Sequence, residues 1–277
     1  MSSNKYILLI FSLFLFGCGS KSNSGIEADQ NQSIINGIEV TKSDIISKHS
    51  VLIYFYQKNA STDPRPEVVG QCSGVIIGKK SILTAAHCFT DPKIKRKNFL
   101  EVYFTQSGDE LYKLEQSGLM INGTDISPHP YYNTSERSPF DLAVVTLSKP
   151  IPTGFEPIEI LPYNVELKIN DVVIPAGYGR RTEVDGIYNH RLNKSLGVPI
   201  IEDWGTHFIV NQANSSGICS GDSGGPTFLS SKGKLYLAGI NQGLIPLSEG
   251  SKVKCQNQGV VVKVQTHKTW ILDNIAN

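Results

Sequence analysis

Three residues with the chemistry needed for acyl transfer are spread along the chain. Ser223 lies in CSGDSGGP, residues 219–226, His87 lies in LTAAHC, and Asp141 lies in SPFDLAVVTL. A serine hydroxyl attacks a carbonyl group when a histidine takes its proton and a carboxylate orients that histidine. The glycines around Ser223 suit either a loop that presents a nucleophile or a simple polar turn, since glycine tolerates tightly folded backbone conformations.

Each of these residues also has a purely structural interpretation. His87 could pack beside a disulfide formed by Cys88, and Asp141 could cap a loop before an apolar strand. The chain has 6 histidines and 25 acidic residues, so the mere presence of the three residue types shows nothing. Their surroundings and their order along the chain must decide between the interpretations.

The elements that would position these residues are predicted to be β-strands. Short runs rich in Val, Ile and aromatic residues recur between Gly, Pro, Asn and Asp, at residues 50–56, 74–78, 99–105, 141–148, 171–177, 235–240 and 259–264. No helical pattern separates them, which argues against a parallel α/β sheet and favours an antiparallel all-β class.

The last segment, THKTWILDNIAN, is the exception and is predicted to be a helix. Trp270, Ile271 and Ile275 would share one apolar face, and Thr266 would cap the N-terminus. A terminal helix of this kind is expected to dock on the body of the domain.

Composition limits the classes of partner. The 277 residues carry 26 Lys and Arg against 25 Asp and Glu, so overall charge recruits neither nucleic acid nor an acidic membrane. The basic run KIKRK, residues 93–97, is interpreted as a solvated loop. A proline-containing stretch at 147–162 reads as a connector between two β halves, either a mobile linker or a strap over the surface.

The first residues have the layout of an export signal. A single lysine precedes an apolar run at 6–16, and small residues follow around Cys18. The run is about half as long as the roughly 20 residues that a membrane-spanning helix needs, so a permanent anchor is the weaker interpretation. The ending LFGC resembles a bacterial lipoprotein signal, in which Cys18 would carry lipid, with ordinary signal cleavage as the alternative. We expect a signal at 1–17 and a flexible tether or propeptide at 18–33.

The remaining cysteines form an even set. With Cys18 in the export segment, two disulfides are expected among Cys72, Cys88, Cys219 and Cys255, and three pairings are open. The spacing contains no CxxC pair and no clustered histidines, so no metal site is predicted.

Taken together, the motifs TAAHC, DLAVVTL and CSGDSGGP, in that order, resemble the chymotrypsin-like, or trypsin-like, serine proteases. Further similar segments are IING at 34–37, HPYYN at 129–133, AGYGR at 176–180 and GVVVKVQTHKTWI at 259–271. The resemblance covers nearly everything from Ile34 onward. It implies two packed antiparallel six-stranded β-barrels with a C-terminal helix over residues 34–277, and the connector at 147–162 as their junction.

The resemblance also implies roles for individual residues. Ser223 would be the nucleophile, His87 the general base and then acid, and Asp141 the group that orients the imidazole. The backbone N–H groups of Gly221 and Ser223 would form the oxyanion hole. No cofactor is implied.

The cysteine pairing and the activation step follow from the same resemblance. The disulfides would be Cys72–Cys88 and Cys219–Cys255. Cleavage before Ile34 would create an ammonium group that pairs with Asp222 and organises the oxyanion hole. The preceding residue is Ser33 rather than Lys or Arg, so activation by a trypsin-like enzyme is not indicated.

The specificity pocket departs from the trypsin pattern. Gly217 stands where relatives that cut after Lys or Arg have an aspartate, and Gly243 and Gly259 are the other pocket positions. A cationic side chain would find no buried partner, so a neutral substrate residue, apolar or small, is expected. The stretch GINQGL at 239–244 replaces the usual serine, aromatic residue and glycine of the pocket edge, which leaves the size of the pocket open.

These observations predict a monomeric serine endopeptidase made as a zymogen. It would be exported from a bacterial cell, held at a membrane by lipid on Cys18 or released by cleavage before Ile34, and would act on proteins or peptides. The alternative is a catalytically silent, surface-attached binding protein that retains the protease scaffold.

Overall fold

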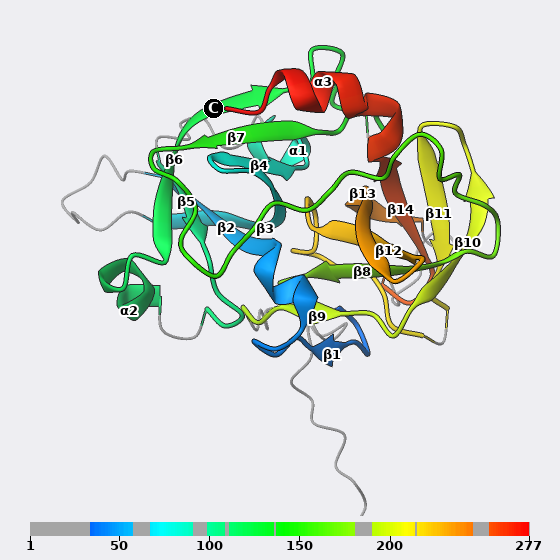
Figure 1. Cartoon of the computed structure of the whole chain (residues 1–277), viewed down its shortest axis with the longest axis horizontal. Helices are drawn as coiled ribbons and strands as arrows, with labels where there is room; N and C mark the ends of the chain where they lie inside the picture. The colour runs from blue at the N-terminus through cyan, green and yellow to red at the C-terminus, as the bar shows by residue number, and fades with distance from the viewer. Residues whose placement is uncertain are drawn as a thin grey trace, which may run out of the picture.

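The computed structural model describes residues 34–57, 67–90, 99–108, 111–135, 137–180, 190–213, 215–245 and 255–276. These residues form two antiparallel β-barrels that lie side by side, with a helix at the C-terminus (Figure 1). The predicted signal, Cys18, the tether and the KIKRK run lie outside the described residues. Within the described part of the chain, no helix is both long and apolar enough to cross a membrane.

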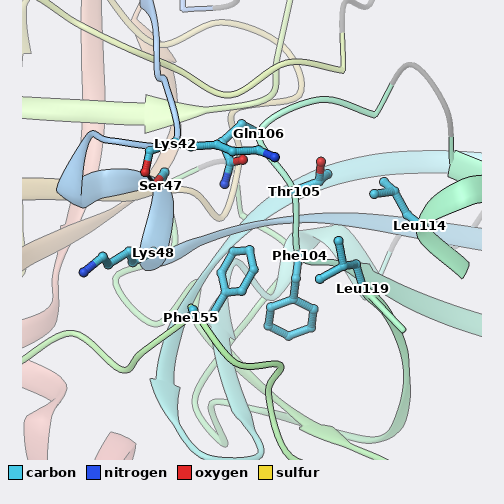
Figure 2. Close-up of a pocket in the computed structure, with 10 residues that line it drawn as sticks. Lys42, Ser47, Lys48, Phe104, Thr105, Gln106, Leu114, Leu119 and Phe155 are labelled. Atoms are coloured by element: carbon cyan, nitrogen blue, oxygen red, sulfur yellow. Dashed lines mark hydrogen bonds between the residues drawn. The ribbon is translucent and has the colours of Figure 1, made fainter. Parts of the chain in front are cut away.

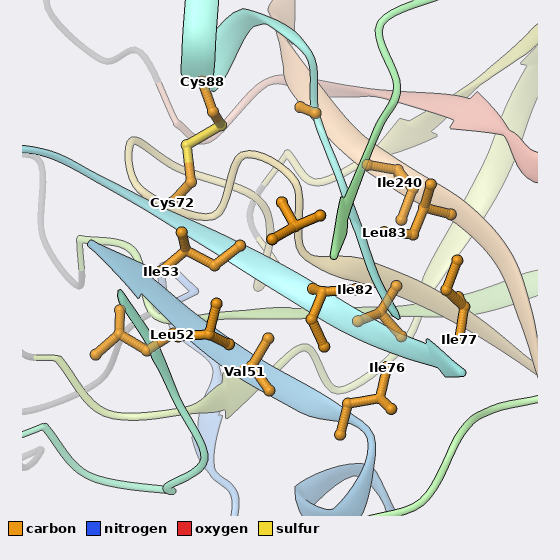
Figure 3. Packing of buried hydrophobic residues seen from close by; sticks show 14 of the residues in the cluster. Val51, Leu52, Ile53, Cys72, Ile76, Ile77, Ile82, Leu83, Cys88 and Ile240 are labelled. Atoms are coloured by element: carbon orange, nitrogen blue, oxygen red, sulfur yellow. A yellow bond between two sulfur atoms is a disulfide. The ribbon is translucent and has the colours of Figure 1, made fainter. Parts of the chain in front are cut away.

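The first barrel is closed by six strands in the order β2-β3-β4-β7-β6-β5. Their bounds are β2 Ser50–Gln57, β3 Glu67–Gly78, β4 Ser81–Thr84, β5 Phe99–Tyr103, β6 Met120–Pro128 and β7 Ala143–Leu147. Aliphatic side chains from β2, β3 and β4 fill its interior, and the Cys72–Cys88 disulfide lies at one side of this cluster (Figure 3). Short helices α1 (His87–Thr90) and α2 (Leu111–Gln116) follow β4 and β5.

The second barrel also has six strands, in the order β8-β10-β11-β14-β13-β12, and a β12–β8 pairing closes it. The bounds are β8 Val172–Gly177, β10 Val198–Asp203, β11 His207–Asn211, β12 Pro226–Ser231, β13 Lys234–Ile245 and β14 Gln258–Lys263. Two short strands, β1 (Ile38–Glu39) and β9 (Asn193–Lys194), pair beside β8. The predicted fold class is therefore confirmed.

Every predicted β-rich run overlaps a strand, but the sequence patterns missed several strands. The strands without a predicted counterpart are β1, β4, β6, β9, β10, β11 and β12. The catalytic candidates depend on two of these, since β4 leads to His87 and β12 follows the Ser223 loop.

The C-terminal helix is shorter than predicted. A 3-10 turn, η2 (Val264–His267), precedes α3 (Lys268–Asp273). The prediction that Thr266 caps the helix was wrong. Thr266 lies within the 3-10 turn, and its hydroxyl donates to the carbonyl of Lys263 at 2.7 Å. Ile271 is fully buried, and Trp270 and Ile275 pack against the large core cluster that includes residues of both barrels.

The connector between the barrels is held as a strap. It runs across the surface between β7 and β8 (Figure 1). The Ile158 N–H donates to Ile76 of the first barrel, and the Leu161 N–H donates to Leu237 of the second, each at 2.9 Å. Hydrogen bonds to both barrels exclude a freely mobile linker.

A separate hollow of about 280 Å³ opens on the first barrel, next to the 3-10 turn η1 (Ile45–Lys48) (Figure 2). Phe104 and Phe155 contact each other edge to face within its lining, and Lys48 forms a surface ion pair with Glu156. None of the candidate catalytic residues lines it.

Candidate active site

His87 and Asp141 meet because two strands of the first barrel pair in register. Thr84, the last residue of β4, lies opposite Ala143, the first residue of β7. His87 comes just after β4 and Asp141 just before β7, so the antiparallel pairing brings them to the same edge of the barrel.

The contact between them uses both oxygens of the carboxylate. Asp141 Oδ2 lies 2.6 Å from His87 Nδ1, and Oδ1 accepts the His87 backbone N–H at 2.8 Å. Asp141 exposes 3% of its side chain, whereas His87 exposes 37%. Since Nδ1 faces the carboxylate, Nε2 is the ring nitrogen available to exchange a proton with a neighbouring hydroxyl.

Ser223 lies in a turn whose backbone needs glycine on both sides. Gly221 has φ 94° and Gly224 has φ 78°, a region that other residues rarely adopt. A Cβ on Gly224 would come within 2.0 Å of Thr84 Oγ1, so this loop packs directly against the strand that leads to His87. Ser223 itself is half-buried.

The first barrel anchors this loop through Ser73 of β3. The Ser73 N–H donates to the Ser223 carbonyl at 2.8 Å, and its hydroxyl donates to the Gly221 carbonyl at 3.0 Å while accepting the Tyr178 N–H. Within the described part of the chain, neither the Gly221 N–H nor the Ser223 N–H donates a hydrogen bond. Two neighbouring free donors are what an oxyanion hole requires.

The second barrel holds the same loop through Asn241, which the sequence patterns did not single out. Its backbone bonds Gly224 and Gly225, and its side chain donates to the carbonyls of Ala176 and Asp222. The nucleophile loop is therefore fixed from both barrels.

Asp222 is fully buried and has only neutral partners. Its oxygens accept the N–H groups of Gly179 at 2.8 Å and Cys219 at 2.9 Å. Burial raises the pKa of this carboxyl to about 7, although the two hydrogen bonds oppose the shift. Ile34, the predicted partner after cleavage, is also fully buried, and its neighbour Ile35 accepts the Gly217 N–H at 3.0 Å.

Both expected disulfides, Cys72–Cys88 and Cys219–Cys255, are present in the structure. The first fixes the residue next to His87 to β3. The sulfurs of Cys72 and Cys88 lie near His87 in a group that resembles a ligand set, but the disulfide consumes the thiolates that a metal would need.

The predicted pocket positions are brought together only in part. Gly217 and Gly259 face the same side chain, that of Gln212, which the sequence patterns also missed. Gly243 lies on β13, opposite Val260 of β14, and a Cβ there would meet no atom of the described residues within 4 Å.

A polar layer lies behind Asp141. Gln242 is buried and donates from Nε2 to the Ser138 carbonyl at 3.0 Å. Burial lowers the pKa of His207 nearby, and the charge of Asp141 acts in the opposite direction. Ser138 and Gln242 lie within the stretches SPFDLAVVTL and GINQGL, but neither was predicted to be a site residue, because only the fold brings them together.

Two β-barrels with a His–Asp pair and a glycine-framed serine define the class of chymotrypsin-fold serine proteases. Residues 49–271 match the family model described as trypsin, and the chain belongs to this family. Proteases of this family act on protein or peptide substrates.

Similar proteins share this assignment. The chain is 27% identical to trypsin eta of Drosophila erecta, covering 98% of this chain and 100% of that protein. It is 25% identical to the urokinase-type plasminogen activator of Gallus gallus over 74% of this chain and 50% of that protein. The solved structure of mouse neuropsin, a serine protease, shares the fold with a TM-score of 0.64 at 23% identity, over 87% of this chain and 99% of neuropsin.

Proposed function

We propose that this protein is an active serine endopeptidase in which Ser223 is the nucleophile, His87 the general base and acid, and Asp141 the orienting carboxylate. The observation that carries this proposal is the 2.6 Å contact between His87 Nδ1 and Asp141 Oδ2, next to a loop with two free backbone donors.

In the acylation step, Ser223 Oγ attacks the peptide carbonyl while His87 Nε2 takes the hydroxyl proton. Asp141 stays ionised and stabilises the imidazolium. The N–H groups of Gly221 and Ser223 bind the oxyanion of the tetrahedral intermediate. His87 then protonates the departing amine, and an acyl-enzyme remains.

Deacylation repeats these steps with water as the nucleophile. His87 removes a proton from water, the hydroxide attacks the acyl-enzyme, and collapse of the second tetrahedral intermediate releases the acid and returns the proton to Ser223. Every step uses side chains and backbone groups of this chain.

Activation would occur by cleavage between Ser33 and Ile34. The new ammonium of Ile34 would pair with Asp222, which is buried and has no cationic partner among the described residues. The Ile35 contact with Gly217 supports this step, because it already holds the start of the described chain against the pocket wall.

We also propose how the protein is processed and where it is located. Residues 1–17 would direct export from a bacterial cell, Cys18 would carry lipid, and 18–33 would serve as the tether. The catalytic domain would work as a monomer, and the cut before Ile34 would both activate it and release it from the membrane. Two disulfides fit an extracellular protein.

A second candidate is a catalytically silent binding protein on the same scaffold. The observation that favours it is the altered strand β13, where Gln242 and Leu244 occupy positions next to the site. In this case the His87–Asp141 pair would serve only stability.

Hydrolysis of an unfolded protein substrate distinguishes the two candidates. The full chain would carry the recognition sequence of an added processing protease in place of residues 29–33, and would be cut before Ile34. We expect cleavage of the substrate that is lost in Ser223→Ala. If the cut, folded chain and Ser223→Ala are equally inactive toward varied substrates, the silent candidate is favoured.

A further inference from the structure

Gln212 is a fully buried polar side chain just after β11. Its Nε2 donates to the carbonyls of Ile218 at 2.8 Å and Cys255 at 2.6 Å, and its Oε1 accepts the Ile218 N–H at 3.0 Å. Both amide protons are therefore used within the protein. Buried amides that are bonded in this way hold one fixed orientation.

This side chain fills the space that Gly217 and Gly259 face. A Cβ on Gly217 would come within 2.3 Å of Gln212 Cδ, and a Cβ on Gly259 within 2.7 Å of Gln212 Oε1. Val210 and Ile218 close the same space at 2.8 and 2.9 Å from that second Cβ. The two glycines thus do not open a deep cavity.

The third predicted pocket position, Gly243, has open space beside it. Among the residues that the structure describes, a Cβ on Gly243 meets no atom within 4 Å, and Gly243 lies on the strand whose Asn241 bonds the Ser223 loop. A side chain has room at Gly243 and none at Gly217 and Gly259, which is the pattern expected for a shallow pocket.

We propose that Gln212 forms the floor of the specificity pocket and restricts the enzyme to substrates with a small, uncharged side chain on the acyl side of the scissile bond. This inference rests on the proposed function. A long side chain would have to displace Gln212 and break its hydrogen bonds to the N–H and carbonyl of Ile218 and to the carbonyl of Cys255. The neutral amide also gives Lys or Arg no ionic partner.

The test uses the cut full chain and peptide substrates that differ only in this side chain: Ala, Leu, Phe or Lys. We expect kcat/KM for Ala to exceed that for Phe and Lys by roughly 10-fold to 200-fold or more, the range for misfitting groups in an apolar pocket. In Gln212→Ala, the ratio of Leu or Phe to Ala should rise by at least about tenfold.

Two further variants test whether the volume of the Gln212 side chain or its hydrogen bonds restrict the substrate. Gln212→Met keeps a side chain of similar length, so it should retain the preference for Ala. Gln265→Ala is the matched control, since Gln265 also donates two hydrogen bonds to backbone carbonyls, those of Pro162 and Val165, but lies in η2 outside the pocket. Its substrate profile should equal that of the unaltered chain.

A labelling step keeps the two proposals distinguishable. A small fluorophosphonate reacts with an activated serine without needing a deep pocket. Labelling at Ser223 combined with a preference for Phe or Lys would overturn the Gln212 inference alone, as would an unchanged profile in folded Gln212→Ala. Failure of the folded, cut chain to label would overturn the proposed function and this inference with it. If Gln212→Ala does not fold, the profile of the unaltered chain decides.

Discussion

Two buried aspartates near the nucleophile have opposite environments. Asp141 is bonded by His87 through both oxygens, so its carboxylate faces a side chain that can become cationic. Asp222 is bonded only by backbone N–H groups, and burial raises its pKa to about 7. The first is suited to stabilising an imidazolium during turnover, and the second to receiving a charge that the uncut chain does not yet provide.

Replacing Asp141 tests its orienting role. Asp141→Asn keeps the size of the side chain but favours the wrong tautomer of His87, so kcat should fall about 10⁴-fold, as in other Ser-His-Asp proteases. Steady-state kinetics on the cut chain measure this loss, and urea unfolding serves as the check that the variant is folded. A loss below about tenfold would contradict the assigned role.

The raised pKa of Asp222 predicts that the uncut chain loses stability as the pH rises. A carboxyl with a higher pKa in the folded chain binds more protons when folded, so the free energy of unfolding falls between about pH 4 and pH 7. Urea unfolding at pH 4.5 and 7.5 should show a larger loss in the uncut chain than in uncut Asp222→Asn. Equal losses in both would contradict this prediction.

At the scale of elements, β3 and β13 position the nucleophile loop from the two barrels. Ser73 on β3 holds the carbonyls of Ser223 and Gly221, and Asn241 on β13 holds Gly224 and Gly225. The free N–H groups of Gly221 and Ser223 share peptide planes with the carbonyls of Ser220 and Asp222, which accept hydrogen bonds from the Arg180 N–H and from Asn241 Nδ2. The Ser73 hydroxyl fixes the Gly221 carbonyl, which lies between these two donors.

Removing the Ser73 hydroxyl should therefore disturb the oxyanion hole. Ser73→Ala leaves the Gly221 carbonyl and the Tyr178 N–H without their bonds, at a cost of about 1–3 kcal/mol in unfolding free energy. We expect kcat to fall more than KM changes, measured on the cut chain. Ser117→Ala, which loses only an exposed bond to Leu114, is the control and should leave kcat unchanged.

Some strands could be predicted from the sequence and others could not. The runs that became β2, β7 and β14 are dense in Val, Ile and Leu, because these strands are buried. By contrast, β6 consists almost entirely of exposed and half-buried residues and contains Gly123, and β12 begins at Pro226, so neither shows a clear period of apolar residues. Their pairing partners stabilise them, which no local pattern records.

The site residues could be predicted from the sequence only where a motif marks them. The order and surroundings of His87, Asp141 and Ser223 pointed to one family, and the structure places His87 against Asp141. Gln212 lies outside the motifs, and Asn241 lies in GINQGL, which the sequence marks only as an altered pocket edge. Their function depends on contacts with residues distant in sequence, such as Cys255 and Ala176.

At the scale of the whole molecule, the proposed activity depends on how the two barrels are held together. The first barrel supplies His87 and Asp141 and the second supplies Ser223, while the strap bonds both barrels. Cleavage before Ile34 would add an ion pair with Asp222 inside the second barrel, next to the loop that both barrels fix.

This arrangement predicts that activity of the cut enzyme falls at alkaline pH. The ammonium of Ile34 has an unperturbed pKa near 8, which pairing with Asp222 would raise, and its deprotonation removes the charge that organises the oxyanion hole. Profiles of kcat/KM between pH 7 and 11 should show this decline. Acetylation of the new amino group should abolish activity at all pH values, and full activity after complete acetylation would contradict the activation step.

The most direct test of the central claim is the intact mass of the chain after reaction with a fluorophosphonate, with the modified residue located by peptide sequencing. The account predicts one adduct per chain, on Ser223, after the cut before Ile34, and none in Ser223→Ala or Asp141→Asn over the same time. A folded, cut chain that gains no adduct, or gains it on another residue, would contradict the assignment of Ser223 as the nucleophile.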